Sequence, residues 1–369
     1  MTSRSRTPVR IGIVGAGFVA DLYLRALQHV RFQEVTALAA RSPEKAREVA
    51  KRFDIPTVVD NARTLAERDD VDLVVIALPQ DLHVQAVADV VAAGKAVICT
   101  KPLGRNAAEA AECLRLVTEV GVWHAYAETE VFAPALVSAK ELTDSGAIGE
   151  VLTVRSREAH GHPHEHAKDA ARSGGGPLRT LGCHCVAIGR WFIGYEHAPV
   201  EVLAWGDRLA RQDVSTEDTA TAIVRFANQR VAQIEVGWNH VAGLDVRNEI
   251  HGTRGWIATD ETGSTGIHAY AGSSAGYVME KAGNATGWIT PVPDEAWTYG
   301  YHAEMAHFIE CFRHGATPRQ TFVDGYIDNA VIDAVYQAIE RGTWAPIDLS
   351  AISQIPPRQE QERIKEQKA

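Results

Sequence analysis

The hydrophobic positions in the first third of the chain switch repeatedly between two spacings. Short apolar runs predict buried strands at residues 10–14, 35–40, 73–77 and 96–100. Apolar residues recurring every three or four positions predict helices at residues 20–30, 43–53, 82–93 and 107–117. Strands and helices in this order are typical of βαβ units, so we predict a doubly wound parallel sheet covered by helices on both faces.

Beyond residue 150 the pattern changes to consecutive strands. We predict them at residues 151–156, 200–206, 219–226, 232–238, 247–251 and 257–259. Helical spacing is found at residues 136–145, 183–192, 301–313 and 324–341. Because the strands follow one another with few crossovers, we predict a mostly antiparallel, open-faced sheet with helices on one face. The two patterns divide the 369 residues into an α/β domain at 1–128 and an α+β domain at 129–369.

Composition and charge exclude several classes of partner and cellular location for these domains. The net charge is −10 and the chain has no long basic run, so we expect neither a nucleic acid nor a membrane surface as partner. No apolar segment reaches the roughly 18 residues of a transmembrane helix. Residues 1–6 lack the apolar core of a secretory signal, and we expect them and the polar tail from Gln354 to be poorly ordered. Five irregularly spaced cysteines predict free thiols and a cytoplasmic location.

The first strand–helix junction carries the most specific signal. An apolar run at residues 10–14 enters Gly15-Ala16-Gly17-Phe18-Val19-Ala20, and an apolar helical pattern follows. In dinucleotide-binding folds the first glycine permits a tight turn, and the second lets the backbone approach a pyrophosphate at the positive end of the helix. We therefore predict a nicotinamide dinucleotide in contact with Gly15, Gly17, Phe18 and Val19.

The end of the second predicted strand bears on which nucleotide is bound. An acidic residue there would accept a hydrogen bond from the ribose 2′-hydroxyl of NAD. The chain instead has Ala39-Ala40-Arg41-Ser42, and Arg41 and Ser42 suit a 2′-phosphate. This slightly favours NADP. If Arg41 is exposed and only stacks on adenine or makes no contact, NAD remains an alternative nucleotide.

Several segments resemble motifs of the Gfo/Idh/MocA oxidoreductases. They are IALPQDLH at residues 76–83, AGKAVICTKPL at 93–103, GGGPL at 174–178 followed by GCH at 182–184, and further segments at 217–220, 250–255 and 322–325. The resemblance spans about residues 9–348. It implies an N-terminal Rossmann domain that binds NAD(P), with Leu78, Pro79, His83 and Lys101 beside the nucleotide. It also implies a C-terminal domain that binds a sugar, cyclitol or related polyol and whose sheet forms homodimers or homotetramers.

Two residues are candidates for the chemistry. Oxidation of a secondary alcohol by hydride transfer needs a group that takes the hydroxyl proton. Lys101 follows a parallel strand at the edge where ligands bind, and desolvation there would lower its pKa. His184 is the second candidate, because its ordinary pKa lies near working pH. The alternative interpretation of Lys101 is a surface lysine that follows a strand, and that of His184 is a buried histidine whose ring is hydrogen-bonded to a backbone carbonyl.

Three positions depart from the family pattern around these candidates. Thr100 replaces the glutamate that usually precedes the Lys-Pro pair. Thr180 and Ala187 replace the aspartates that usually lie four residues before and three residues after the histidine. The usual proton relay of lysine, aspartate and histidine is therefore incomplete, and Thr180 is left to hydrogen-bond a substrate hydroxyl.

The segment His160-Gly161-His162-Pro163-His164-Glu165-His166 is unusual. Its glycine and proline interrupt regular structure, so we predict an active-site loop and no metal. We also predict no metal at Cys183-His184-Cys185, since neither a strand nor a helix would gather these three side chains. Expected substrate contacts are Tyr126, Glu128, Glu130, His162 and His164. Three cationic residues bracket the loop. Two interpretations are open: they bind an anionic group of the substrate, or they are solvated surface charges, which we favour. The three residues are Lys168, Arg172 and Arg179.

Three functions follow from these features. The leading one is an NAD(P)-dependent dehydrogenase of a sugar, glycoside or cyclitol. The second is a redox-neutral glycosidase of the same family, which oxidises, eliminates, hydrates and reduces, and whose substrate could be an anionic sugar such as a sulfoquinovoside. The third is a non-catalytic nucleotide sensor, favoured by the missing acidic residues and opposed by Lys101.

Overall fold

The computed structural model describes residues 7–241, 243–263, 266–272, 286–292, 294–353 and 355. The expected disorder at residues 1–6 and in the tail from Gln354 falls outside these residues, apart from Ile355. Within them, no helix combines the length and the apolar character needed to cross a membrane. All five cysteines are free thiols.

The N-terminal part is a parallel six-stranded sheet, as predicted. Its strand order is β3-β2-β1-β4-β5-β6, the order of a dinucleotide-binding fold. The strands are β1 (Val9–Val14), β2 (Gln33–Ala39), β3 (Thr57–Val59), β4 (Leu73–Ile76), β5 (Ala96–Thr100) and β6 (His124–Ala127). The helices are α1 (Phe18–Leu27), α2 (Pro43–Arg52), α3 (Ala62–Ala66), α4 (His83–Ala92) and α5 (Ala107–Val120). The elements β3, β6 and α3 were not predicted, because each is too short to show a period.

The C-terminal part is built on a seven-stranded sheet of order β12-β11-β7-β10-β9-β8-β15. Its strands are β7 (Val151–His160), β8 (Pro199–Asp207), β9 (Thr219–Phe226), β10 (Val231–Gly237), β11 (Leu244–Gly252), β12 (Trp256–Asp260) and β15 (Ala345–Pro346). Every neighbouring pair is antiparallel except β7 and β10, which confirms the mostly antiparallel prediction. The strand β7 continues four residues beyond its predicted end at residue 156, and these extra residues reach the candidate site.

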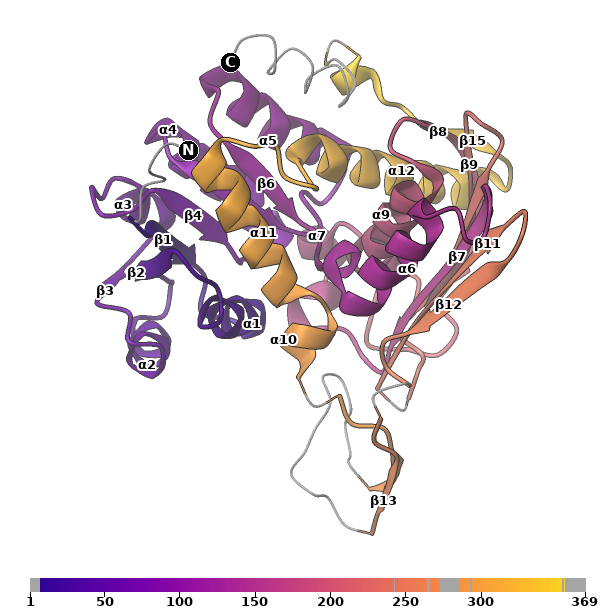
Figure 1. Ribbon diagram of the computed structural model, residues 1–369, viewed down its shortest axis with the longest axis horizontal. Helices are drawn as coiled ribbons and strands as arrows, with labels where there is room; N and C mark the ends of the chain where they lie inside the picture. The colour runs from indigo at the N-terminus through magenta and orange to yellow at the C-terminus, as the bar shows by residue number, and fades with distance from the viewer. Residues whose placement is uncertain are drawn as a thin grey trace.

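Helices lie on the face of this sheet that is turned toward the first sheet (Figure 1). The longer ones are α6 (Pro134–Asp144), α9 (Gly182–Ile193), α11 (Tyr301–His314) and α12 (Phe322–Arg341), and the shorter ones are α7 (Ala170–Ser173), α8 (Pro177–Thr180) and α10 (Glu295–Thr298). All of α9 is buried, against β7, β10 and α12. In the described part of the chain, no helix covers the opposite face, where Trp205 and Ile223 are exposed.

The last two long helices join the two parts of the chain. The helix α11 contacts α1, and α12 contacts both α5 and β8, so the second sheet is held against the first (Figure 1). Phe322, Tyr326 and Ala330 of α12 belong to the same hydrophobic cluster as strand residues of β4 and β5. A small hairpin of β13 (Ala269–Ala271) and β14 (Gly287–Ile289) projects from the body of the molecule. Four 3-10 turns complete the described elements: η1 (Gln80–Leu82), η2 (Thr129–Phe132), η3 (Glu165–Lys168) and η4 (Ser350–Ile352).

Candidate active site

The turn between β1 and α1 has the shape that a pyrophosphate requires. Gly15 has a φ of +121°, and a Cβ added to it would lie 2.2 Å from the carbonyl oxygen of Ala77. Gly17 precedes α1, no side chain caps the helix, and a Cβ added to Gly17 would meet no atom within 4 Å. The first turn of α1 therefore faces open space, and this cradle fits the phosphates of a dinucleotide.

Residues expected near the rest of the nucleotide divide into two groups. Leu78, Phe18 and Val19 line a pocket formed by residues of both parts of the chain. Arg41 is exposed after β2, and the Ser42 hydroxyl accepts a hydrogen bond from the backbone of α2, so it acts as a helix cap. Both lie at the edge where an adenosine ribose binds in this fold.

His83 does not face a nucleotide, contrary to the prediction. Its side chain is fully buried, and its two ring nitrogens lie 2.9 Å from the carbonyl oxygen of Leu78 and 3.2 Å from that of Leu103. Burial lowers the pKa of His83, which favours the neutral ring, and the single N–H of that ring donates to one of these two carbonyl groups. Pro79 directly precedes η1 and lies outside the pocket lining.

Lys101 reaches the same pocket from the end of β5. It is joined to Pro102 by a cis peptide bond, and its Nζ donates a hydrogen bond of 2.9 Å to the backbone carbonyl of Thr180. Burial lowers the pKa of Lys101, but Cys183 and the carboxylates of Glu158, Glu128 and Glu130 more than offset this, and the net direction is upward. The expected fall in the pKa of Lys101 is therefore wrong, because carboxylates that are distant in sequence surround it.

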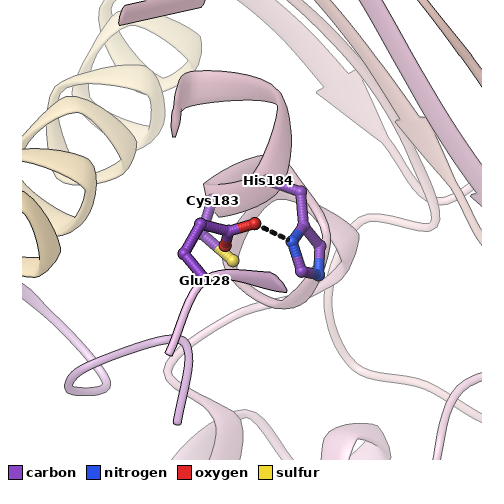
Figure 2. A group of neighbouring side chains, drawn as sticks. All are labelled: Glu128, Cys183 and His184. Carbon is purple, nitrogen blue, oxygen red and sulfur yellow. Dashed lines mark hydrogen bonds and ion pairs between the residues drawn. The ribbon is translucent and has the colours of Figure 1, made fainter. Parts of the chain in front are cut away.

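His184 reaches the same pocket from the first turn of α9. Its Nδ1 donates to Oε1 of Glu128 over 2.5 Å, as Figure 2 shows. Its Nε2 lies on the other side of the ring, 3.9 Å from Oε2 of Glu158. Glu128 directly follows β6, is fully buried and does not line the pocket. It therefore orients His184 instead of contacting substrate, and it supplies a carboxylate that Thr180 and Ala187 lack.

Two further carboxylates line the pocket. Glu158 comes from β7, and its Oε1 lies 3.0 Å from Nε2 of His160. Burial would raise the pKa of Glu158, but His184, His160 and Lys101 outweigh this and lower it. Glu130 comes from η2, and burial together with Glu158 and Glu128 raises its pKa well above the ordinary range.

The sequence did not lead us to Glu158, and His160 was expected only as part of the histidine-rich loop. The alternation of a strand places Ser156, Glu158 and His160 on one face of β7, and all three are buried. This alternation was a usable signal once the strand was extended beyond residue 156.

Potential metal-ligating groups do come together here, although sequence analysis expected none to do so. Single ligand atoms of Glu130, Glu158 and His184 all lie within 4.8 Å of one another, and so do those of Glu128, Cys183 and His184 (Figure 2). The sequence argument compared only neighbours along the chain and therefore missed the glutamates from other elements. The donor set of one imidazole and two carboxylates could hold a divalent cation.

The histidine-rich segment folds over the pocket as a loop. His164 lines the pocket, and its ring centre lies 5.9 Å from that of Phe18 and 5.8 Å from that of His166. His162 does not line the pocket. Thr180 does line it and also anchors Lys101 through its carbonyl group.

Tyr126 and Arg179 are buried away from the pocket, contrary to prediction. Tyr126 is fully buried in the core of the first sheet. Arg179 is 2% exposed, donates a 3.0 Å hydrogen bond to the Asn329 side chain and pairs with Asp333. Both residues hold α12 or the sheet in place, so neither is available for a substrate.

The remaining two cations of the predicted cluster also have carboxylate partners. Lys168 lies 2.7 Å from Glu165, and Arg172 lies 3.1 Å from Asp81. Neither lines the pocket. The structure therefore does not assemble the anion-binding group, and the interpretation as paired surface charge is the better one.

Comparisons with known proteins agree with this architecture. Residues 9–127 match the family model "Oxidoreductase family, NAD-binding Rossmann fold", and residues 136–258 match "GFO/IDH/MocA C-terminal domain". The chain is 30% identical to an inositol 2-dehydrogenase of Acidothermus cellulolyticus over 91% of this chain and 94% of that protein. It is 26% identical to a levoglucosan dehydrogenase of Pseudarthrobacter phenanthrenivorans over 94% and 99% of the two chains. The solved structure of GenD2 from gentamicin A biosynthesis, in complex with NAD, superposes with a TM-score of 0.86 at 26% identity, over 94% and 98% of the chains.

Proposed function

Since the chain belongs to the Gfo/Idh/MocA oxidoreductase family, we propose that it transfers a hydride between NAD(P) and a secondary hydroxyl of a sugar or cyclitol. One observation carries the proposal. Lys101 from the first sheet and His184 from α9 line a single pocket that also includes Phe18 and Val19 of the nucleotide turn. The dehydrogenase names of the relatives support the same reaction class.

The bound nicotinamide supplies the hydride acceptor, and the chain's own groups handle the proton. Glu128 accepts the Nδ1 proton of His184, so the Nε2 that faces the pocket carries a lone pair. A hydroxyl placed beside that nitrogen loses its proton there as the carbonyl forms. Lys101, held through the Thr180 carbonyl, donates a hydrogen bond to the same oxygen and stabilises its developing negative charge.

A spectrophotometric assay tests this proposal. Purified protein is mixed with NAD or NADP and a panel of sugars and inositols, and reduced nucleotide is followed at about 340 nm. We expect turnover that His184→Ala and Lys101→Ala each reduce by about 100-fold or more, the usual size of an acid–base or oxyanion contribution. Lys51→Ala, on the exposed surface of α2, is the matched control. Variants that retain full turnover would refute the assigned roles.

The same assay separates the two competing functions. A redox-neutral glycosidase releases its aglycone in the presence of oxidised nucleotide without net reduction. An anionic sugar substrate is no longer supported, because Arg172 and Arg179, which were expected to bind its anionic group, are paired with Asp81 and Asp333. A nucleotide sensor binds NAD(P) and turns over no substrate.

We propose NADP as the preferred nucleotide, on the strength of Arg41. It is exposed directly after β2, where Ala39 and Ala40 offer no carboxylate to a ribose 2′-hydroxyl. We expect Arg41→Ala to raise the KM for NADP about tenfold and to leave the KM for NAD nearly unchanged. Equal effects on both nucleotides would remove this preference.

We also propose that residues 1–128 form the nucleotide domain, that residues 129–369 form the substrate domain, and that the uncovered face of the second sheet mediates a homodimer or homotetramer. Exposed Trp205, Ile223 and Trp256 on that sheet support such an interface. Light scattering coupled to gel filtration tests the assembly, and a monomer at micromolar concentration would contradict it.

A further inference from the structure

The pocket contains a carboxylate that the protein itself leaves unpaired. Glu130 is only 5% exposed and lines the pocket beside Glu158. Among the described residues, its carboxylate makes no hydrogen bond and no ion pair within 4 Å. Oε2 of Glu158 is likewise buried without a hydrogen-bond partner. The nearest ammonium, that of Lys101, is directed to the Thr180 carbonyl.

An unpaired buried carboxylate is costly, so its persistence in the pocket points to a partner supplied by the ligand. A buried acidic group without a partner costs several kcal/mol or takes up a proton. Ligand atoms of Glu130 and Glu158 lie within 4.8 Å of each other, so one small group can contact both. A neutral hydroxyl offers a single proton and no charge. A primary ammonium offers three N–H donors to the carboxylate of Glu158 and the carboxyl group of Glu130, and its positive charge favours the ionised form of Glu130, which burial and Glu158 otherwise disfavour.

We propose that the substrate is an amino-substituted sugar or cyclitol, and that its ammonium group binds between Glu130 and Glu158. This inference rests on the proposed function, because it assigns the substrate class of that site. Once the ammonium is held there, a nearby ring hydroxyl faces His184 and Lys101, which line the same pocket. Glu130 and Glu158 then determine specificity, and His184 and Lys101 carry out the chemistry.

The test compares matched ligands. Monosaccharides and inositols that carry a primary amine are assayed beside their N-acetyl and hydroxyl counterparts, both for turnover and for calorimetric binding in the presence of NADPH. We expect the amine form to be favoured about 10- to 100-fold in kcat/KM and in Kd, the size of one charged hydrogen bond. Glu130→Gln keeps the shape of the side chain and should reduce this preference to about threefold or less.

The control is Glu165→Gln, an identical substitution at a side chain that is 88% exposed and outside the pocket. It should leave the amine preference unchanged. Binding of NADPH by Glu130→Gln, measured by its fluorescence, shows that the variant is folded.

Two results would overturn the inference. One is the absence of any amine preference in both turnover and binding. The other is stoichiometric binding of Mn²⁺ or Zn²⁺ that depends on Glu130, which would assign the carboxylates to a metal. Amine binding without any formation of reduced nucleotide would instead overturn the proposed function while leaving the amine site in place.

Discussion

Replacing Glu128 with glutamine probes the contact that organises the candidate active site. Glu128 holds Nδ1 of His184 over 2.5 Å in a fully buried setting. The substitution preserves the volume of the side chain but removes the negative charge that stabilises an imidazolium. It also lets the amide donate to Nδ1, which would reverse the tautomer and block Nε2.

The size of the effect follows from the geometry. Two unit charges whose centres lie about 4 Å apart interact by about 4 kcal/mol at an effective dielectric constant of about 20. Part of this is offset by the easier desolvation of an amide, so we expect the barrier to rise by about 2 to 4 kcal/mol, a fall in kcat of roughly 30- to 1,000-fold. The KM for substrate should change little, because Glu128 does not line the pocket.

Steady-state kinetics at pH 7 measures this prediction. In the variant, kcat should fall and the KM for substrate should stay close to the wild-type value, because Glu128 contacts His184 and lies outside the pocket lining. Glu304→Gln is the matched control. Glu304 is equally buried and also lies outside the pocket lining, so this substitution makes the same exchange at a buried glutamate with no recorded hydrogen bond to His184. Wild-type kcat for Glu128→Gln would refute the assigned role of Glu128.

Three other substitutions have outcomes that the structure specifies. Gly17→Ala should change the melting temperature by no more than about two degrees, because the added Cβ meets no protein atom. It should weaken NADPH binding about tenfold or more, because the Cβ enters the space where the phosphates bind. Thermal melts and calorimetry check the two effects, and an unchanged affinity for NADPH would contradict the assigned phosphate site. Arg179→Met should lower the free energy of unfolding by about 3 kcal/mol in urea melts, because it removes the ion-pair partner of Asp333 and the donor to the Asn329 side chain. The substrate KM should stay unchanged, and a selective rise in KM would restore a substrate role. Asp218 accepts hydrogen bonds from the backbone N–H groups of residues 209–211, and these outweigh its burial and lower its pKa. Asp218→Asn should therefore lower the free energy of unfolding by about 1 to 3 kcal/mol at pH 7. This loss should shrink as the pH falls from about 4 through the lowered folded-state pKa, and an equal loss at pH 7 and pH 3 would contradict the prediction.

Short-range chemistry explains why so much of the first sheet could be predicted. The strand β4 is a continuous apolar run, and β1 after Arg10 and β5 before Thr100 are nearly so, while the longer helices between the strands show their own period. The tight turn at Gly15 depends on a positive φ and on the close approach of Ala77, both tied to a local glycine pattern. Family motifs added Lys101 and His184, which the structure does bring together in one pocket.

Residues whose environment comes from distant segments were predicted less well. His83 and Arg179 look like ligand-binding residues in sequence, yet each is buried against backbone or side chains far along the chain. Glu158 lay just beyond the predicted end of its strand at residue 156, and the charged residues there do not reveal that α9 packs against β7. The upward direction of the Lys101 pKa likewise depends on Cys183 and on carboxylates from two other segments, Glu158 of β7 and Glu128 and Glu130 at η2.

The amino-acid sequence by itself determined the nucleotide turn, the alternation of strands and helices, and the identity of the lysine and the histidine, because these depend on local backbone geometry and on periodic burial. Only the tertiary structure decided that Glu128 orients His184, that Glu130 faces the pocket without a partner, and that three predicted cations are paired elsewhere. The physical reason is that charge and hydrogen-bond pairing depend on distances of a few ångströms between segments that the chain order does not place together.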